Sequence, residues 1–282
     1  MTQFVLFTLS AACNSDIASR TLSGVCKTEN AAVTVISSHA VSVPVDSVEI
    51  MKGVRASNER CLVLDEGPTV VIGDLHLGYE RALEGEGIFL PRINTSSIRD
   101  SLNRIICRYE PKRMVLLGDI KHDFAKAPYE CRLEVTRMID MLSDVAEVIV
   151  VKGNHDNFLQ NILSDIGIVL HDFTDIAGLR LEHGHIDSGK RPVVIGHEHP
   201  SVRISGAMSG SVKLQCFLHA EKDGVLVIPP FSPFSSGNDL SEEGFMSGAC
   251  RKADMNRAKV YGVSEIGILR LGELGELRRT EL

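Results

Sequence analysis

Four β-branched residues run directly into a polar turn in the stretch Val148-Ile149-Val150-Val151-Lys152-Gly153-Asn154-His155-Asp156. A short run of Val and Ile that is closed by glycine predicts a buried strand. Amide, imidazole and carboxylate groups then follow at the carboxyl end of that strand, which is where open α/β sheets bind their ligands. The stretch therefore predicts a strand of a buried sheet and part of a functional site.

Four other strand-like runs are each followed at once by acidic or imidazole side chains. The runs are 70–72, 114–117, 179–181 and 193–195, and the motifs after them are Asp74-Leu75-His76, Gly118-Asp119, His183-Gly184-His185 and Gly196-His197-Glu198-His199. One D-x-H pair occurs by chance in many proteins, but five such motifs in order do not fit satisfied core polar groups or solvated loops. Carboxylate, amide and imidazole groups that converge at strand ends predict a site for two divalent cations.

The amino-acid composition limits the classes of function that the protein can have. The chain has 282 residues, of which 44% are hydrophobic and 24% are charged, as in an ordinary globular protein. Its net charge of -7 provides no overall basic field for nucleic acid, although a local groove is not excluded. The seven cysteines include no C-x-x-C pair, so we expect a reducing compartment and a cytoplasmic protein. No run approaches the ~20 apolar residues of a membrane span, so we expect no membrane contact.

The order of the predicted elements indicates the fold class. Predicted strands at 61–64 and 69–72 and at the motif runs alternate with predicted helices at about 94–109, 128–145 and 157–165. The later pattern consists mostly of strands, at 179–182, 193–195, 202–204, 212–218, 225–228 and 266–271. Strand–helix alternation followed by a run of strands predicts an α/β protein with a two-sheet β-sandwich flanked by helices.

Two segments lack this periodicity. Residues 1–50 are rich in Ser, Thr and Ala, and we interpret them as a disordered extension or the product of an upstream start codon, with the folded domain at 51–282. A signal peptide is disfavoured because no Lys or Arg precedes the apolar run at 4–9. Residues 229–259 are rich in Gly, Ser and Pro and form a long loop for a compact domain. This loop is either a lid over the site or a mobile surface loop.

The five motifs resemble the pattern D-x-H, G-D, G-N-H-D/E, H and G-H-x-H of the calcineurin-like metallophosphoesterase superfamily, here over residues 74–199. The resemblance implies that architecture and a dinuclear metal site. It implies that one metal is held by Asp74, His76, Asp119 and His199. It implies that the other metal is held by Asp119, Asn154, His183 and His197, with Asp119 as the bridge. His155 resembles the family's substrate-facing histidine, which is not a metal ligand.

The chemistry of the residues agrees with that assignment. Two cations ~3.5–4 Å apart clamp a phosphate ester for in-line displacement, so we expect attack by a metal-bridging hydroxide. Only Asp74 and Asp119 are anionic among the expected ligands, so two divalent ions keep a residual positive charge that attracts phosphate esters. His155 would protonate the leaving oxygen or stabilise the developing charge. The mixed nitrogen and oxygen donors suit Mn, Fe, Zn or Co.

Residues 70–80, 118–122, 196–200 and 230–234 resemble a narrower prokaryotic branch, which includes DNA ligase-associated phosphoesterases. In that branch activity is commonly tied to Mn and to phosphodiesters. We therefore expect a Mn-dependent phosphodiesterase whose phosphate-ester substrate is a nucleotide or a nucleic acid. The link to DNA rests on association rather than chemistry. The alternatives are a phosphomonoesterase or a nucleotide pyrophosphohydrolase and, from another class, a non-catalytic scaffold, which the complete set of expected ligands disfavours.

Several residues near the motifs have two interpretations. His122 stands where the more usual family pattern G-D-x-x-D has aspartate, and is either an outer partner of a ligand or a loop histidine. Asp156 either orients His155 or caps the following helix. His185 competes with His183, which the strand end favours. Four basic residues in nearby loops would bind substrate phosphates or stay solvated surface charges: Arg81, Arg92, Lys190 and Arg191.

Overall fold

The computed structural model describes residues 45–85, 87–89, 93–122, 129–205, 210–235, 237–240 and 244–280, which all belong to one compact unit of the chain. The predicted extension up to residue 44 lies outside the described residues, as does Arg92. Strand β1 spans Ser47–Met51, with Val48 and Ile50 buried. It therefore begins before Met51, where the apolar pattern places the start of the domain, and ends at that residue.

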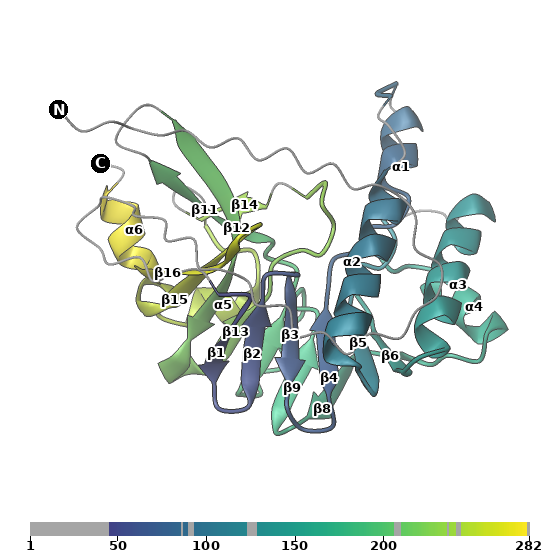
Figure 1. Cartoon of the computed structure of the whole chain (residues 1–282), viewed down its shortest axis with the longest axis horizontal. Helices are drawn as coiled ribbons and strands as arrows, with labels where there is room; N and C mark the ends of the chain where they lie inside the picture. Colours follow the sequence, from purple (N-terminus) through teal and green to yellow (C-terminus); the bar gives the residue numbers. More distant parts are fainter. Residues whose placement is uncertain are drawn as a thin grey trace, which may run out of the picture. The chain divides into compact units, whose positions relative to one another are not determined.

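The first of two β-sheets carries three of the motif strands (Figure 1). Its strands lie in sequence order: β1, β2 (Val54–Ser57), β3 (Cys61–Leu64), β4 (Thr69–Ile72), β5 (Arg113–Leu117), β6 (Glu147–Val151) and β7 (Leu170–His171). Pairing is antiparallel from β1 to β4 and parallel from β4 to β7. The carboxyl ends of β4, β5 and β6 therefore lie at one edge of the sheet.

The second sheet carries the other two motif strands, in the spatial order β14-β11-β12-β13-β10-β9-β8, and β15 pairs with both β12 and β16. Its strands are β8 (Phe173–Ile176), β9 (Leu179–Glu182), β10 (Val193–Ile195), β11 (Pro200–Ser205), β12 (Ser211–Ala220), β13 (Val225–Val227), β14 (Asn238–Asp239), β15 (Lys259–Ser264) and β16 (Gly267–Glu273). Strands β9, β10 and β13 run parallel to one another. The carboxyl ends of β9 and β10 therefore also share an edge.

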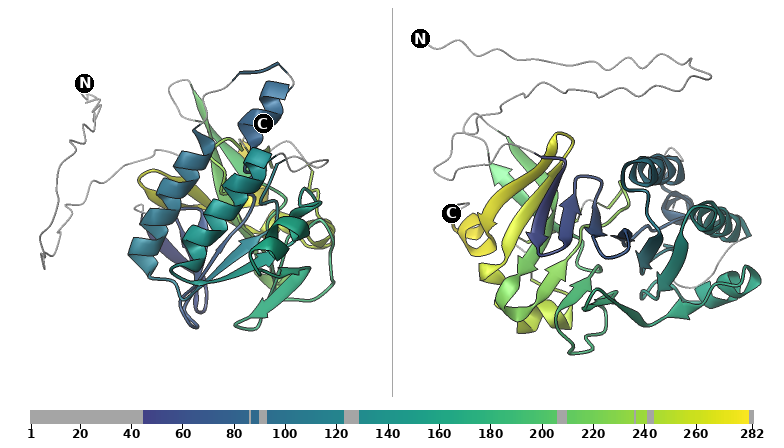
Figure 2. Two further views of the ribbon diagram at one scale, coloured as in Figure 1. Left: turned by 90° about the vertical axis from the view of Figure 1, so that its right-hand side faces the viewer. Right: turned by 60° about the horizontal axis from the view of Figure 1, so that its bottom comes forward.

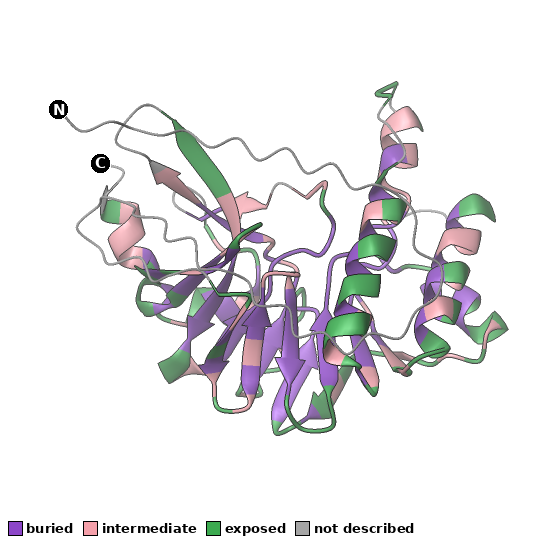
Figure 3. Ribbon diagram, viewed as in Figure 1, coloured by how far each residue is buried: buried purple, intermediate pink, exposed green. Residues whose placement is uncertain are grey.

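The two-residue alternation of the strands separates the apolar core into layers. In β3, Leu62 and Leu64 contribute to a core that also contains Leu181 of β9 and Val194 of β10, so this layer lies between the sheets. The alternate residue Val63 belongs to a second core, which the sheet shares with helices. Figure 3 shows that the strands are largely buried, whereas the helices expose their outer faces.

Helices cover the outer face of each sheet (Figure 2). The first sheet packs against α2 (Asn94–Tyr109), α3 (Tyr129–Ser143) and α4 (Leu159–Asp165), and the second packs against α5 (Gly248–Lys252) and α6 (Leu274–Thr280). The remaining helical elements are α1 (Tyr79–Gly85) and the short 3₁₀ turns Glu221–Asp223 and Met255–Arg257. The predicted α/β fold, a two-sheet sandwich flanked by helices, is confirmed.

The segment 229–259, which lacks a sequence period, contains regular structure. Strand β14 pairs in parallel with β11, and α5 packs its buried Ala249 and Cys250 into the outer core of the second sheet. Among the residues that the structure describes, no helix is both long and apolar enough to cross a membrane.

Candidate metal centre

The five sequence motifs converge at the carboxyl ends of strands from both sheets. The predicted ligands are Asp74 and His76 after β4, Asp119 after β5, Asn154 after β6, His183 after β9, and His197 and His199 after β10. Because the strands within each set are parallel, their carboxyl ends bring these side chains to the same side of the fold.

Asp74, His76 and His199 form the first donor group. One possible ligand atom from each lies within 4.8 Å of the others. His199 Nε2 lies 3.2 Å from Asp74 Oδ1 and 3.3 Å from His76 Nε2. The buried Nδ1 atom of His76 has no hydrogen-bond partner among the described residues. Buried polar atoms are rarely left unpaired, so this atom fits a site that a ligand completes.

Asp119, His183 and His197 form the second donor group, again with ligand atoms within 4.8 Å of one another. His183 Nε2 lies 3.4 Å from Asp119 Oδ2 and 3.1 Å from Asn154 Oδ1. His183 Nδ1 lies 3.0 Å from the carbonyl oxygen of Leu117. A carbonyl only accepts hydrogen bonds, so Nδ1 carries the proton and Nε2 faces the other donors.

The two donor groups adjoin each other and His155. His183 Nδ1 lies 3.8 Å from Asp74 Oδ1, which links the groups. His155 Nε2 lies 3.7 Å from Asp119 Oδ2. The structure therefore brings the seven predicted ligands and His155 together in one cluster.

The motif glycines leave space for the predicted ligands of neighbouring strands. A Cβ added at Gly196 would lie 2.7 Å from Asp74 Oδ2. A Cβ added at Gly153 would collide with the Asp119 carboxylate. Any larger residue at these two positions would therefore displace one of the only two carboxylates in the cluster.

Five of the predicted ligands adopt a left-handed backbone: Asp74 (φ 58°), His76 (φ 49°), Asp119 (φ 50°), His197 (φ 65°) and His199 (φ 47°). This conformation is uncommon outside glycine. Backbone strain of this kind persists where the surrounding structure enforces it, and it gathers at functional sites. The cluster is therefore held in a conformation that its own residues do not favour.

The charges in the cluster favour a bound cation. Burial alone would lower the pKa of His183, but its hydrogen bond to Asp119 and the charge of Asp74 raise it to about 9. Burial raises the pKa of Asp74, but the neighbouring His199 brings it below its ordinary value. Burial lowers the pKa of His76 to about 3. A metal ion that binds here would displace the proton from His183, because ligands coordinate in their deprotonated form.

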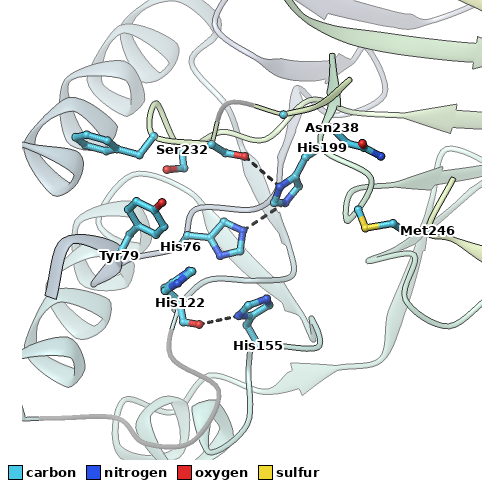
Figure 4. Close-up of a pocket in the computed structure, with 11 residues that line it drawn as sticks. His76, Tyr79, His122, His155, His199, Ser232, Asn238 and Met246 are labelled. Atoms are coloured by element: carbon cyan, nitrogen blue, oxygen red, sulfur yellow. Dashed lines mark hydrogen bonds between the residues drawn. The ribbon is translucent and has the colours of Figure 1, made fainter. Parts of the chain in front are cut away.

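The cluster opens into a pocket of about 410 Å³ (Figure 4). The motif loops and α1 line it with His76, Tyr79, His122, His155 and His199, and the chain after β13 lines it with Ser232, Phe234, Ser235, Gly237, Asn238 and Met246. The first half of the 229–259 segment, from Ser232 to Met246, therefore contributes a wall of the pocket. Sequence reasoning did not assign these wall residues, although the segment begins directly after a strand.

Hydrogen bonds fix this wall to the motifs. The backbone N–H of Ser232 donates to the carbonyl of Asp74 at 3.2 Å, and Ser235 Oγ lies 3.0 Å from His199 Nδ1. The fully buried Glu198 accepts hydrogen bonds from the backbone N–H groups of Met246, at 3.0 Å, and Ser247. Glu198 therefore anchors the wall.

Asp156 does neither of the two things that the sequence suggests. Its Oδ1 atom accepts a hydrogen bond from the N–H of Ile120 at 2.9 Å, and Oδ2 accepts one from the N–H of Gly153 at 2.8 Å. The partner of His155 Nδ1 is instead the carbonyl of His122, at 2.6 Å. The first turn of α4 has no side-chain cap. Asp156 therefore joins the loops after β5 and β6.

His122 lies in the pocket wall, with its ring centroid 5.4 Å from that of His76 and 5.5 Å from that of His155. His185 lies beside His183, at 5.3 Å between ring centroids, but belongs to neither donor group. The basic candidates that the structure describes do not line this pocket: Arg81, Lys190 and Arg191. Arg81 and Arg191 are paired with nearby carboxylates instead.

Two helix-flanked sheets with carboxylates and imidazoles at their strand ends define a metal-dependent hydrolase. A family model narrows this class, because it matches residues 67–228 and describes calcineurin-like phosphoesterases. The chain belongs to this family and is a metal-dependent phosphoric ester hydrolase that acts on phosphate esters. The predicted superfamily resemblance is therefore confirmed, whereas the DNA ligase-associated branch stays a prediction.

A solved nuclease structure shows the same fold. A nuclease from Pseudomonas putida, MPE, matches with a TM-score of 0.60 and 17% identity over 79% of this chain and 98% of that chain. The protein of unknown function AQ665 from Aquifex aeolicus matches with a TM-score of 0.30 and 17% identity over 47% of this chain and 79% of that chain. No curated protein sequence matches the chain.

Proposed function

We propose that this protein is a phosphodiesterase that uses two divalent metal ions, with Mn²⁺ as the expected ion. The observation that carries the proposal is the pair of adjoining donor groups, each built from one carboxylate and two imidazoles. In the proposal, Asp119 is shared between both ions. The first ion also takes Asp74, His76 and His199, and the second also takes Asn154, His183 and His197. Such mixed donors suit Mn, Fe, Zn or Co.

The charge balance supports a phosphate substrate. Two divalent ions on two carboxylates leave the pocket positive, although the whole chain carries a net charge of -7. When bound, the ions would polarise the phosphoryl group and promote deprotonation of a water molecule. An anionic ester is attracted to such a pocket, and a neutral ester is not.

His155 is the proposed general acid. Its Nδ1 atom donates to the carbonyl of His122 at 2.6 Å, so its Nε2 atom faces the metal groups, 3.7 Å from Asp119 Oδ2. A protonated imidazole in this position donates its Nε2 proton to the leaving oxygen. The backbone bond to His122 keeps the ring oriented for that transfer.

An aromatic wall supports a substrate that carries a nucleobase. The rings of Tyr79 and Phe234 are stacked, with centroids 6.1 Å apart and an interplanar angle of 27°. Tyr79 also contacts His122 edge-to-face at 4.7 Å. Aromatic side chains bind bases by stacking without reading their sequence. The fold shared with a nuclease adds nucleic acid as a candidate, so we propose a nucleotide or a nucleic acid as the phosphodiester.

The cysteines support a cytoplasmic location for this reaction. The structure describes five of them, all as free thiols: Cys61, Cys107, Cys131, Cys216 and Cys250. Scattered free thiols are typical of a reducing compartment.

The test uses the full chain, because β1 begins before Met51. Metal-depleted protein is assayed with an aryl phosphodiester and the matching monoester, with and without Mn²⁺. We expect diester hydrolysis that requires Mn²⁺ and is lost in His155→Gln and Asp119→Asn. The exposed His171 provides a matched control, and His171→Gln should keep the activity. Preference for the monoester would show that the protein is a phosphomonoesterase rather than a phosphodiesterase. Two bound ions without hydrolysis of either ester would favour a non-catalytic scaffold.

A further inference from the structure

We propose that His76, His122 and His155 form a third metal site, which binds Zn²⁺ or a similar nitrogen-preferring ion and thereby inhibits the enzyme. The inhibition rests on the proposed function of His155, whereas the binding does not. One ligand nitrogen from each of the three side chains lies within 4.8 Å of the other two. Rotation of the rings would bring these nitrogens to the ~2.0–2.1 Å at which imidazole binds zinc, so that a single ion contacts all three.

The three imidazoles gather at one side of the pocket (Figure 4). The ring centroids lie 5.4 Å apart for His76 and His122, 5.1 Å for His76 and His155, and 5.5 Å for His122 and His155. The three residues come from the loops after β4, β5 and β6, so the parallel sheet fixes their spacing. An ion could therefore bind without a rearrangement of the fold.

The donor set of this group differs from the other two. The groups around Asp74 and Asp119 each contain a carboxylate, whereas this one contains imidazole nitrogens alone. Imidazole suits Zn, Cu and Ni, while Mn and Mg prefer oxygen ligands. Three histidines that leave a fourth position open also make a recurrent zinc arrangement. The third site should therefore select Zn²⁺ over Mn²⁺.

The tautomer of His155 is already that of a ligand. Its Nδ1 atom lies 2.6 Å from the carbonyl oxygen of His122, which can only accept, so Nδ1 carries the proton. In the neutral ring the Nε2 lone pair is then available for an ion. A second-shell bond from the other ring nitrogen to a carbonyl is common among metal-binding histidines. Residue 122 thus contributes both a donor ring and the carbonyl that orients His155.

Occupation of this site would stop catalysis because it blocks His155. An ion on His155 Nε2 takes the lone pair that would carry the transferred proton, so no general acid remains. Excess Zn²⁺ should therefore inhibit the Mn²⁺-loaded protein.

Zinc stoichiometry of the full chain tests the binding directly. Wild type and His122→Gln are dialysed against excess Zn²⁺, and bound zinc is measured by elemental analysis. We expect wild type to hold one more zinc ion per chain than His122→Gln, whatever the total number of zinc ions that wild type binds. His185→Gln removes a neighbouring imidazole that lies outside this group, and should bind as many ions as wild type. His122→Asn serves as a second variant, and circular dichroism identifies any variant that does not fold.

Inhibition is measured separately on the Mn²⁺-loaded proteins. The zinc concentration for half inhibition should rise at least about 10-fold in His122→Gln, since even an outer partner of a ligand changes metal affinity by ~10–100-fold. Equal zinc stoichiometry in wild type and both folded His122 variants would overturn the third site. Equal inhibition would show that zinc acts by displacing Mn²⁺, and would overturn the inhibitory role. Inactive protein with the stoichiometry difference intact would refute the proposed function alone.

Discussion

The backbone N–H of His155 donates a hydrogen bond to Asp119 Oδ1 at 2.9 Å. The other carboxylate oxygen of Asp119 faces His183 Nε2 at 3.4 Å. Burial would raise the pKa of Asp119, but the hydrogen bonds from His183 and His155 hold it well below its usual range. Asp119 is therefore anionic at neutral pH, and one side chain positions both the proposed general acid and a donor of the second metal group.

Gly153→Ala should damage the site by steric pressure on Asp119. The added methyl group would collide with the Asp119 carboxylate and backbone, so the loop after β5 must shift. Overpacking of this kind costs about 1–3 kcal/mol. We expect a lower free energy of unfolding in denaturant titrations and a loss of Mn²⁺-dependent activity. Gly244 has open space around its Cα, so Gly244→Ala is the control, and equal effects of the two substitutions would contradict the steric account.

Ser235→Ala should weaken metal binding without changing a proposed ligand. When Nε2 of His199 binds the metal, Nδ1 would carry the ring proton and donate it to Ser235 Oγ, 3.0 Å away. Loss of such an outer partner costs ~10–100-fold in metal affinity or activity. The Mn²⁺ concentration for half-maximal activity should rise by about that factor, and Ser235→Thr should restore it. Ser96, exposed on α2, provides the control Ser96→Ala. An unchanged Mn²⁺ requirement in Ser235→Ala would contradict this role.

Phe234→Ala should change substrate preference rather than general activity. Phe234 stacks with Tyr79 in the pocket wall, and stacking on a base contributes about 1–3 kcal/mol. The KM for a nucleoside aryl phosphodiester should rise about 5- to 150-fold. The KM for a dialkyl phosphate should not change. Phe89, which is 81% exposed and does not line the pocket, gives the control Phe89→Ala. A parallel rise for both substrates would argue against base stacking.

Asp187→Asn should lower stability in a pH-dependent way. Asp187 Oδ1 accepts from Arg191 at 3.0 Å, and Oδ2 accepts from Lys252 of α5 at 2.8 Å. Burial raises the pKa of Asp187, but these hydrogen bonds bring it below its ordinary value. Because the folded-state pKa is the lower one, this stabilisation is present above ~pH 4 and is lost as pH falls through the folded pKa.

We therefore expect Asp187→Asn to reduce the free energy of unfolding by about 1–3 kcal/mol at pH 7, and by less at pH 3. Urea titrations of wild type and variant at both pH values measure the difference. The same deficit at pH 3 as at pH 7 would mean that the charge of Asp187 does not contribute.

Elements with a strong local pattern were predictable from the sequence. Strands β3 and β4 and helix α2 begin and end at the residues that the apolar pattern predicts. Helix α1 was not predictable, because Glu80 is its only buried residue and no apolar stripe marks it. The Glu80 carboxylate accepts from the N–H of Asn94 at the start of α2, at 2.6 Å, a contact between residues far apart in the chain.

The candidate site also has a part that the sequence predicts and a part that it does not. The motifs predicted which donors lie together, because parallel strands bring their ends to one edge, and the structure places those side chains in one cluster. Their roles as ligands stay proposals. The pocket wall after β13 was not predictable, because its anchor is the buried carboxylate of Glu198 and its partners are the backbone groups of Met246 and Ser247. No periodic pattern in the local sequence indicates such a contact.

The most direct test of the central claim is a crystal structure of the full chain soaked in Mn²⁺, with anomalous data at the Mn edge. The proposal predicts two peaks ~3.5–4 Å apart. Asp119 should contact both ions, with Asp74, His76 and His199 at one and Asn154, His183 and His197 at the other. A single ion, or two ions that do not share Asp119, would contradict the dinuclear centre.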